Sequence, residues 1–496
     1  MNQMGITQFL MEHAGLRPVS FHMPGHKGAQ LYQRYGYGDF LQRIMDCDIT
    51  EIPGADNLFQ AESIIRETAE QYAALYGVKK SYLLINGTSG GILASVLASV
   101  PKGKKLIMAR NCHKSVFNAL TLGGIEPVYA YPQMVESYGI SGAVSAEEIE
   151  RLLAEHPEAE AVILPSPNYY GICSDIKAIA QVVHQADKIL IVDQAHGAHL
   201  KFFSDFGAAS ELDLSAGSAY DMPYAAEDCG ADLIINSTHK TLASFTQSAV
   251  LNLNSERVAV HVLEDKLQMI ESTSPSYLLM ASLDLNADLL QTHGTELIGQ
   301  WAENLNWFYN EAMRIPGLEL MQVPGRMDRT KINLDLGVYG INGSQLEEEL
   351  MKRNIFAELT TGNILMCMTG IGNQRADYEQ LLNALQEVIV NCKRNLPVSA
   401  DAVQTQPGSA EPPQQLQLWG KRRALQELPK RKELVRLEDA VGRICASSII
   451  PYPPGIPFLC PGEEIGAEEV AYTKALRAAG EKVIGVDENG CVLVGA

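Results

Sequence analysis

The chain has 496 residues, of which 46% are hydrophobic and 20% are charged, a composition typical of a folded protein with two or three domains. Its 39 basic and 59 acidic residues give a net charge of −20, which argues against nucleic acid as a partner. The nine cysteines show neither a CxxC pair nor metal-ligand spacing, so we expect reduced thiols, a cytoplasmic location and no metal site. We also expect no signal peptide and no membrane segment.

Residues 1–60 are rich in glycine, proline and aromatic residues, with one weak helix near Ile6–His13, and we expect an N-terminal arm. Helical and strand patterns alternate over residues 61–265, which predicts a large domain with a mostly parallel sheet. The predicted strands are Ser81–Asn86, Lys105–Ala109, Pro127–Tyr131, Ala161–Pro165, Lys188–Asp193 and Ala231–Ile235. The predicted helices are Glu62–Tyr76, Gly91–Val100, Ser115–Leu122, Val144–Glu155 and Ile176–Gln185.

A smaller α+β domain is expected over residues 266–397. Its predicted elements are a long helix at Ser276–Ala312, helices Gly343–Arg353 and Asp377–Val390, and strands Lys331–Asp335 and Ile364–Met368. Residues 398–416 contain few apolar anchors among Pro, Gln and Ser, and therefore indicate a linker. A C-terminal α+β domain is expected over 417–496, with helices Lys421–Leu428 and Ala467–Ala479 and strands Lys482–Val486 and Cys491–Val494.

A glycine-rich turn, Asn86-Gly87-Thr88-Ser89-Gly90-Gly91, lies between a predicted strand and an apolar helix. Free N–H groups at a helix N-terminus, together with two hydroxyls, can hold a phosphate. The turn is not a P-loop, because no lysine follows at the required spacing. An ordinary turn followed by a helix cap would show the same sequence pattern.

Two further features follow predicted strands. Asp193 ends the apolar run Ile189–Val192, and burying its carboxylate requires a partner such as a protonated pyridine nitrogen, although a helix cap or an ion pair would also serve. Lys240, in Ser237-Thr238-His239-Lys240, is surrounded by hydroxyls and a histidine, the setting of an imine-forming lysine; alone, it would more often be a solvated charge. His113, just past another strand, could stack on a ring.

The order of these features narrows their interpretation. A phosphate cradle, a strand-end Asp193 and a strand-end Lys240 meet the three needs of pyridoxal phosphate: a phosphate site, a carboxylate that keeps the ring nitrogen protonated, and an amine for the aldehyde. All three are expected at the carboxyl edge of one parallel sheet, where ligands usually bind.

Motifs along the chain resemble the short, wingless members of the Orn/Lys/Arg decarboxylase family, and in particular short arginine decarboxylases. The stretches that carry the resemblance are Phe21-His22-Met23-Pro24-Gly25-His26-Lys27-Gly28, Asn86–Gly90, Arg110–Ser115, Asp193–Gly197, Ser237–Lys240, Ser274–Tyr277, Tyr452–Pro457 and Pro461–Glu463. The resemblance implies the α/β fold of fold-type-I pyridoxal phosphate enzymes, which is aspartate aminotransferase-like, with a small α+β domain and a C-terminal α+β domain. The loop after Asp56-Asn57-Leu58 departs from the family pattern.

The resemblance also implies roles for single residues. Lys240 would bond the cofactor aldehyde, Asp193 would hold the pyridine nitrogen and His113 would stack on the ring, with His239 as a possible proton donor. The remaining cofactor contacts would come from Thr88, Ser89, Gly90, Ser237, His196 and, from the partner subunit of a homodimer or larger oligomer, Ser276.

The implied reaction is α-decarboxylation of a basic amino acid in polyamine metabolism, with arginine preferred to lysine or ornithine. A cationic side chain needs a carboxylate, and the candidates are Glu463, Asp56 and Glu358. Two alternatives remain open: an aminotransferase or β/γ-elimination lyase of the same fold, and a catalytically inactive binding protein.

Overall fold

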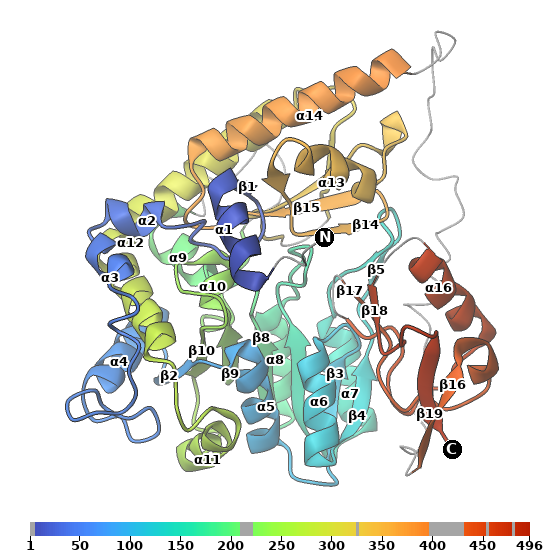
Figure 1. The fold of residues 1–496 in the computed structure, drawn as a ribbon. Coiled ribbons are helices and arrows are strands. Elements are labelled where there is room, and N and C mark those ends of the chain that lie inside the picture. Colours follow the sequence, from blue (N-terminus) through green and yellow to red (C-terminus); the bar gives the residue numbers. More distant parts are fainter. Residues whose placement is uncertain (1–4, 209–221, 324–326, 396–430, 453–455, 479–481) are drawn as a thin grey trace.

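A seven-stranded sheet forms the centre of the computed structural model, which describes residues 5–208, 222–323, 327–395, 431–452, 456–478 and 482–496 (Figure 1). Its strands lie in the order β2 (Lys80–Leu84), β10 (Ala249–Leu253), β9 (Leu233–Asn236), β8 (Ile189–Asp193), β7 (Ala159–Pro165), β3 (Lys105–Ala109) and β4 (Glu126–Ala130). β10 is antiparallel to both of its neighbours, and the other pairs are parallel. The sheet is therefore mostly parallel, as predicted.

Helices cover this sheet because its strands are apolar on both sides. In β3, Leu106, Ile107 and Met108 are all fully buried. The helix α5 packs against α6 and α11, and α7 packs against α8. Their bounds are Gly87–Ser99 for α5, Lys114–Gly123 for α6, Val260–Ile270 for α11, Ala146–Glu155 for α7 and Ile176–Gln185 for α8.

The predicted elements of this region are confirmed, with shifted ends. The bounds of β3 and α8 are those predicted, whereas α5 begins at Gly87 instead of Gly91. The glycine-rich turn is thus the first turn of the helix itself, because packing of α5 on the sheet overrides the low helix propensity of glycine. β10 and α11 were not predicted.

The smaller region has a four-stranded antiparallel sheet, with the strands in the order β11 (Glu319–Leu320), β12 (Lys331–Asp335), β15 (Ile364–Met368) and β14 (Leu359–Thr361). The long helix α12 (Tyr277–Ala312) packs on α4 (Ile64–Tyr76) of the large region and on α14 (Arg375–Asn395) of the small one. α13 (Gly343–Met351) lies beside β14 and β15. In Figure 1 α14 crosses the top of the molecule.

The N-terminal arm runs over both regions. After α1 (Ile6–Leu16), β1 (Val19–Ser20) pairs in parallel with β13 (Ile355–Phe356), and α2 (Gln30–Arg34) and α3 (Gly38–Gln42) follow. Between β1 and α2, Gly25 donates its N–H to the His239 carbonyl at 2.7 Å. A Cβ at Gly25 would lie 2.4 Å from the Leu242 oxygen, so only glycine allows this approach.

The described C-terminal residues form a separate small core. β16 (Lys432–Arg436) pairs with β19 (Cys491–Gly495), β17 (Ile450–Tyr452) pairs with β18 (Lys482–Ile484), and α16 (Ala467–Ala478) lies against them. This core contacts the large region near β3 and β4 (Figure 1). The predicted linker at 398–416 and helix at Lys421–Leu428 lie outside the described residues.

Candidate functional site

Lys240 lies on a single helical turn, α10 (Thr238–Thr241), directly after the buried strand β9. Its Nζ is 2.9 Å from His196 Nε2 and 5.9 Å from the centre of the Tyr169 ring. Sheet register brings this turn near Asp193, because Asp193 at the end of β8 pairs with Ile235 of β9. A small cavity at this edge is lined by both residues, together with Thr88, Asn111, His113, Ser141, Asn168, Tyr169, His196 and Ile456.

Burial makes the amine of Lys240 a weaker base than an exposed lysine. Desolvation lowers its pKa to about 8, and the positive charge of Lys331 acts in the same direction. The carboxylates of Asp193 and Glu358 raise the pKa and so oppose part of this shift. Near neutral pH, a larger fraction of the Lys240 amine than of an exposed lysine is therefore unprotonated and can act as a nucleophile.

Asp193 is the other charged group facing the cavity. It is 6% exposed, and its Oδ1 accepts the Ala195 N–H at 3.2 Å. Burial raises its pKa, while the Lys240 charge and the Ala195 hydrogen bond lower it. A cationic group in the cavity would stabilise the ionised form of this carboxylate.

The glycine-rich turn supplies donors on the same side of the cavity. Thr88 lines the cavity and its Oγ1 accepts the Ser237 hydroxyl at 3.2 Å, so hydroxyls from α5 and from the Lys240 turn meet. Ser89 lies on the first turn of α5, where the backbone N–H groups have no intrahelical acceptor, and Gly90 follows it with its own N–H donated to the Asn86 carbonyl at 3.3 Å. Gly91 is also required, because a Cβ there would lie 2.7 Å from Leu84 Cδ1.

Two cavity histidines are neutral. His113 caps α6 through its Nδ1, which accepts the Ser115 N–H at 3.3 Å, and burial lowers its pKa to about 3. Burial and then the Lys240 charge lower the pKa of His196 well below its usual value. His196 Nδ1 is buried, and it has no hydrogen-bond partner in the described part of the chain. An orphaned buried nitrogen facing a ligand cavity indicates a missing polar partner.

Two residues expected at the site lie elsewhere in this subunit. His239 is not among the cavity-lining residues; its Nδ1 donates to the Ser248 carbonyl at 2.7 Å and burial lowers its pKa to about 4. This geometry does not favour His239 as a proton donor. Ser276 also lies away from the cavity, where its Oγ caps α12 by accepting the Leu279 N–H.

The structure corrects the expectation for Glu463. Its side chain is fully buried and makes a two-pronged ion pair with Arg110, with Nε–Oε1 at 3.1 Å and Nη2–Oε2 at 3.0 Å. Oε2 also accepts the Cys460 N–H. Because both oxygens are used inside the protein, Glu463 has no capacity left to bind a substrate.

Asp56 is corrected for the same reason. Its two carboxylate oxygens accept four backbone N–H groups of its own loop, from Asn57, Glu62, Ser63 and Ile65. Burial acts to raise its pKa, but these hydrogen bonds outweigh it and lower the pKa to about 2. Asp56 therefore organises the loop. Glu358 does not line the cavity in this subunit either, but it remains the candidate, since its charge acts on Lys240 and its Oε2 accepts the Met23 N–H of the arm at 3.0 Å.

Sequence reasoning missed several cavity residues. Tyr169 and Asn168 follow the end of β7, and Ser141 lies on the short strand β6 (Ile140–Ser141), which pairs with β5 (Met134–Val135). The position of Tyr169 after a parallel strand was a readable signal, because all such strand ends meet at one edge. Ile456 comes from the C-terminal region and carried no such signal.

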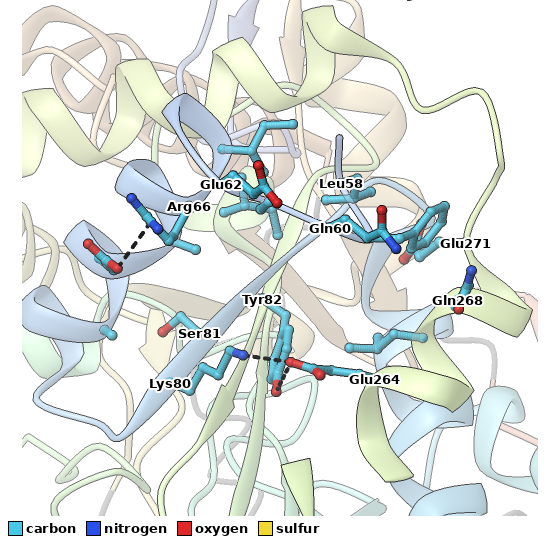
Figure 2. Close-up of a pocket in the computed structure, with 18 of the residues that line it drawn as sticks. Leu58, Gln60, Glu62, Arg66, Lys80, Ser81, Tyr82, Glu264, Gln268 and Glu271 are labelled. Carbon is cyan, nitrogen blue, oxygen red and sulfur yellow. Dashed lines mark hydrogen bonds and ion pairs between the residues drawn. The ribbon is translucent and has the colours of Figure 1, made fainter. Parts of the chain in front are cut away.

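A larger groove, of about 960 Å³, lies away from this cavity (Figure 2). It runs between α4, the edge strand β2 and α11, and it contains ion pairs such as Lys80–Glu264 at 2.6 Å. Glu271 is buried at this groove, near the backbone of Ile85 and Asn86. The groove shares no lining residue with the smaller cavity.

The described residues contain neither a cluster of three potential metal ligands nor a helix long and apolar enough to cross a membrane. Pyridoxal phosphate, in contrast, fits the side chains of the small cavity. Lys240 supplies a nucleophilic amine, Asp193 a buried carboxylate, and Thr88 and Ser237 supply hydroxyls beside free N–H groups of α5. The unpaired Nδ1 of His196 adds a polar group without a protein partner.

Known families and structures share this architecture. The model of the Orn/Lys/Arg decarboxylase major domain matches residues 5–323, and the model of the family's C-terminal domain matches 413–489. Arginine decarboxylase of Bacillus subtilis (strain 168) is 31% identical, over 97% of this chain and 95% of its own length. The constitutive lysine decarboxylase of Escherichia coli (strain K12) is 24% identical over 93% of this chain and 75% of its own length.

Solved structures show the same fold. The E. coli constitutive lysine decarboxylase superposes with a TM-score of 0.73 at 22% identity, covering 99% of this chain and 81% of its own. Lysine decarboxylase A from Pseudomonas aeruginosa gives 0.73 at 20% identity, covering 99% and 80%. The fold is that of fold-type-I pyridoxal phosphate enzymes, as expected. The chain belongs to the Orn/Lys/Arg decarboxylase family, whose members are pyridoxal phosphate-dependent decarboxylases of basic amino acids.

Proposed function

We propose that this protein decarboxylates arginine, releasing CO₂ and leaving the corresponding amine. Relatives named arginine decarboxylase match nearly the whole chain, which favours arginine over lysine or ornithine. The observation that carries the proposal is the cavity where Lys240, with a pKa lowered to about 8, meets Asp193. An aminotransferase or lyase would share this pair, so the product must be identified.

Each cavity residue receives a role on chemical grounds. Bound pyridoxal phosphate would supply an electron-withdrawing ring that accepts the bonding electrons when CO₂ leaves. Lys240 would bond the aldehyde, and Asp193 would keep the ring nitrogen protonated. The neutral imidazole of His113 would pack on the ring without adding a competing positive charge. His196 is held against Lys240 and fixes the position of its amine.

Different residues bind the cofactor phosphate and donate the proton that Cα needs after CO₂ leaves. Thr88, Ser89, Gly90 and Ser237 bind the phosphate through hydroxyls and the N–H groups of α5. After CO₂ leaves, Cα would have to gain one proton, and the Lys240 amine, which lines the cavity and has a pKa lowered to about 8, can carry it. We place this step on Lys240 and not on His239.

Glu358 is our proposed partner for the cationic end of the substrate. Its side chain is 6% exposed, and it lies 3.8 Å from His22 Nε2 of the arm. A carboxylate held in this way pairs well with a guanidinium, which can donate two parallel hydrogen bonds to it in one plane. The ammonium groups of lysine and ornithine are compact point charges and lack this planar geometry. Replacement of Glu358 by glutamine should raise KM for arginine more than it lowers kcat.

A second copy of the chain completes the site in this proposal. Four large apolar side chains in the segments before α12, Met45, Ile52, Ile64 and Met269, are at least half exposed. The Tyr277 hydroxyl, at the start of α12, donates to the Asp56 carbonyl in one of these segments. Exposed large apolar side chains are typical of a protein interface. The groove of Figure 2 is lined by Ile65 and Gln268, next in sequence to Ile64 and Met269, and Ser276 is the N-cap of α12.

The substrate can be tested with separate incubations. The cofactor-loaded protein is incubated with arginine, lysine or ornithine, and the amine and CO₂ are quantified, with Lys240→Ala as the inactive control. We expect amine formation from arginine at a kcat/KM at least about tenfold above the other two. A keto acid without CO₂ would refute the reaction, and a preference for lysine would refute the substrate.

The shared site can be tested by mixing two inactive variants. Lys240→Ala removes the amine, and Ser276→Asp places a negative charge near the phosphate while keeping a good helix cap. If Ser276 serves the partner's site, random pairing restores about one quarter of the wild-type activity. If Ser276 serves its own site, no mixed dimer is active. A monomer in light scattering would also refute the proposal.

We further propose five segments: an arm at 1–60, a large domain at 61–265, a small domain at 266–397, a linker at 398–416 and a C-terminal domain at 417–496. The location we propose is cytoplasmic, and we propose a role in polyamine metabolism. The contact of the C-terminal core with Arg110 supports treating that core as part of the working enzyme.

A further inference from the structure

A cluster of charged and polar side chains is buried on the small-domain side of the Lys240 turn. Asp328, Lys331 and His199 are all 0% exposed. Lys331 Nζ lies 3.2 Å from Asp328 Oδ2, and His199 Nε2 lies 3.1 Å from Asp328 Oδ1. The Thr330 hydroxyl also donates to Oδ1, at 2.7 Å. A buried ion pair is costly unless its remaining hydrogen-bonding positions are filled, as they are here.

At one end of this cluster, His199 contacts Thr241, the residue after Lys240. Burial lowers the pKa of His199, so its ring is neutral, and the neighbouring Asp328 carboxylate fixes the proton on Nε2. The opposite nitrogen, Nδ1, then accepts the Thr241 hydroxyl, 3.1 Å away. The backbone of the catalytic turn is thereby tied to Asp328 through one imidazole.

At the other end of the cluster, Lys331 contacts His196, whose ring lies next to the Lys240 amine. Lys331 Nζ donates to the His196 carbonyl at 3.0 Å, and the ring of His196 contacts Lys240 Nζ at 2.9 Å. Lys331 begins β12 of the small sheet, whereas His196 follows β8 of the large one. The hydrogen bond from Lys331 to His196 therefore joins the two sheets next to the cavity.

We propose that Asp328, Lys331 and His199 are positioning residues, which hold Lys240 between His196 and Thr241 and place the buried charge of Lys331 on the small-domain side of its amine. The proposal rests on the proposed role of Lys240 as the cofactor-bonding lysine. It goes beyond that role because none of the three residues lines the cavity.

Charges on several elements act on Lys240, and the cluster is one of them. Asp193 of β8 and Glu358, before β14, favour the protonated amine, whereas Lys331 of β12 opposes it. The histidines nearby, His113, His196 and His239, have lowered pKa values and are neutral near pH 7. Lys331 is therefore the positive charge that acts against protonation of Lys240.

Two neutralising substitutions should shift the titration of Lys240 in opposite directions. Lys331→Met removes the positive charge and leaves Asp328, so protonation of Lys240 becomes easier. Asp328→Asn leaves Lys331 without its counter-charge, so protonation becomes harder. Each shift should be about 1 pH unit. Loosening of the fold would instead expose Lys240 to water and shift both variants upward.

The experiment uses the full-length protein without added cofactor and labels it with trace acetic anhydride across pH. Mass spectrometry of the Lys240 peptide then gives the pH midpoint of the amine. At pH 7 we expect Lys331→Met to label Lys240 about tenfold more slowly than wild type, and Asp328→Asn to label it faster. The pH titration of the visible absorption band in the cofactor-loaded variants is expected to shift in the same directions.

Two controls keep the result interpretable. Asp232→Asn alters another buried carboxylate, which pairs with His184 at 2.9 Å and lies at the opposite end of β9, so it should leave the Lys240 midpoint unchanged. Lys331→Arg keeps the positive charge and should therefore leave the pH midpoint of Lys240 at the wild-type value. This variant is used if the neutralised variants fail to fold. Unchanged midpoints, or upward shifts in both neutralised variants, would overturn the proposal. Labelling requires no turnover, so this result is independent of whether arginine is decarboxylated.

Discussion

The ion pair between Arg110 and Glu463 should hold the C-terminal core on the large domain. Glu463 is fully buried and Arg110 is 5% exposed. Arg110 also donates to the carbonyls of Pro457 and Phe458, at 2.7 and 3.1 Å, so one guanidinium organises the loop beside Ile456. Replacing Glu463 by alanine leaves this cation buried without a counter-charge, which typically costs about 3–5 kcal/mol.

Hydrogen exchange measures this cost locally, without assuming that the whole protein unfolds in one step. In Glu463→Ala, the amide of Ile449, which donates to the Leu459 carbonyl, should exchange at least about 100-fold faster, since 1.4 kcal/mol corresponds to a factor of ten. The exposed pair Glu438–Lys474 in the same core offers a control, and Glu438→Gln should leave this exchange unchanged.

A double-mutant cycle separates the pair from general disruption. Arg110→Met combined with Glu463→Met should cost less than the sum of the two single changes, because no unpaired charge remains buried. Additive losses, or an exchange rate in Glu463→Ala equal to that of wild type, would refute this account of the interface.

Three further predictions concern single residues. Asp193→Ala should lower kcat at least about 100-fold while cofactor absorbance persists. Burial raises the pKa of Glu271 from 4.5 to about 7, so its ionisation destabilises the fold as pH rises through that range. Glu271→Gln should therefore raise Tm relative to wild type at pH 8 but not at pH 4.5. Gly25→Ala should displace the arm, because its Cβ would lie 2.4 Å from the carbonyl carbon of Thr241; intact arm packing in limited proteolysis would contradict this.

The positions of Asp193 and Lys240 at the ends of neighbouring strands could be predicted from sequence. Both follow short apolar runs, and parallel strands bring such ends to one edge. β10 was missed because it is antiparallel and lies between β2 and β9, so its place in the sheet depends on pairing with β2, which is distant in the sequence. The pairing of β1 with β13 depends on contacts of similar range.

The errors at the site have a common physical cause. The sequence does not show which cation a carboxylate will pair with in the fold. Glu463 could therefore not be recognised as the counter-ion of Arg110, 353 residues away. Asp56 was misinterpreted because its partners are backbone N–H groups of its own loop. Lys331 was predicted only as a strand residue, and its burial beside Asp328 depends on the packing of two sheets.

The central claim is that Lys240 is the lysine that bonds the cofactor. Two other lysines are alternatives: Lys331, whose charge acts on Lys240, and Lys27, whose pKa burial lowers to about 8. Borohydride reduction of the cofactor-loaded protein, followed by peptide mass spectrometry, identifies the bonded lysine. We predict the pyridoxyl phosphate tag on Lys240, with Lys27 and Lys331 unmodified. A tag on either of those two, or no tag at all, would contradict the account.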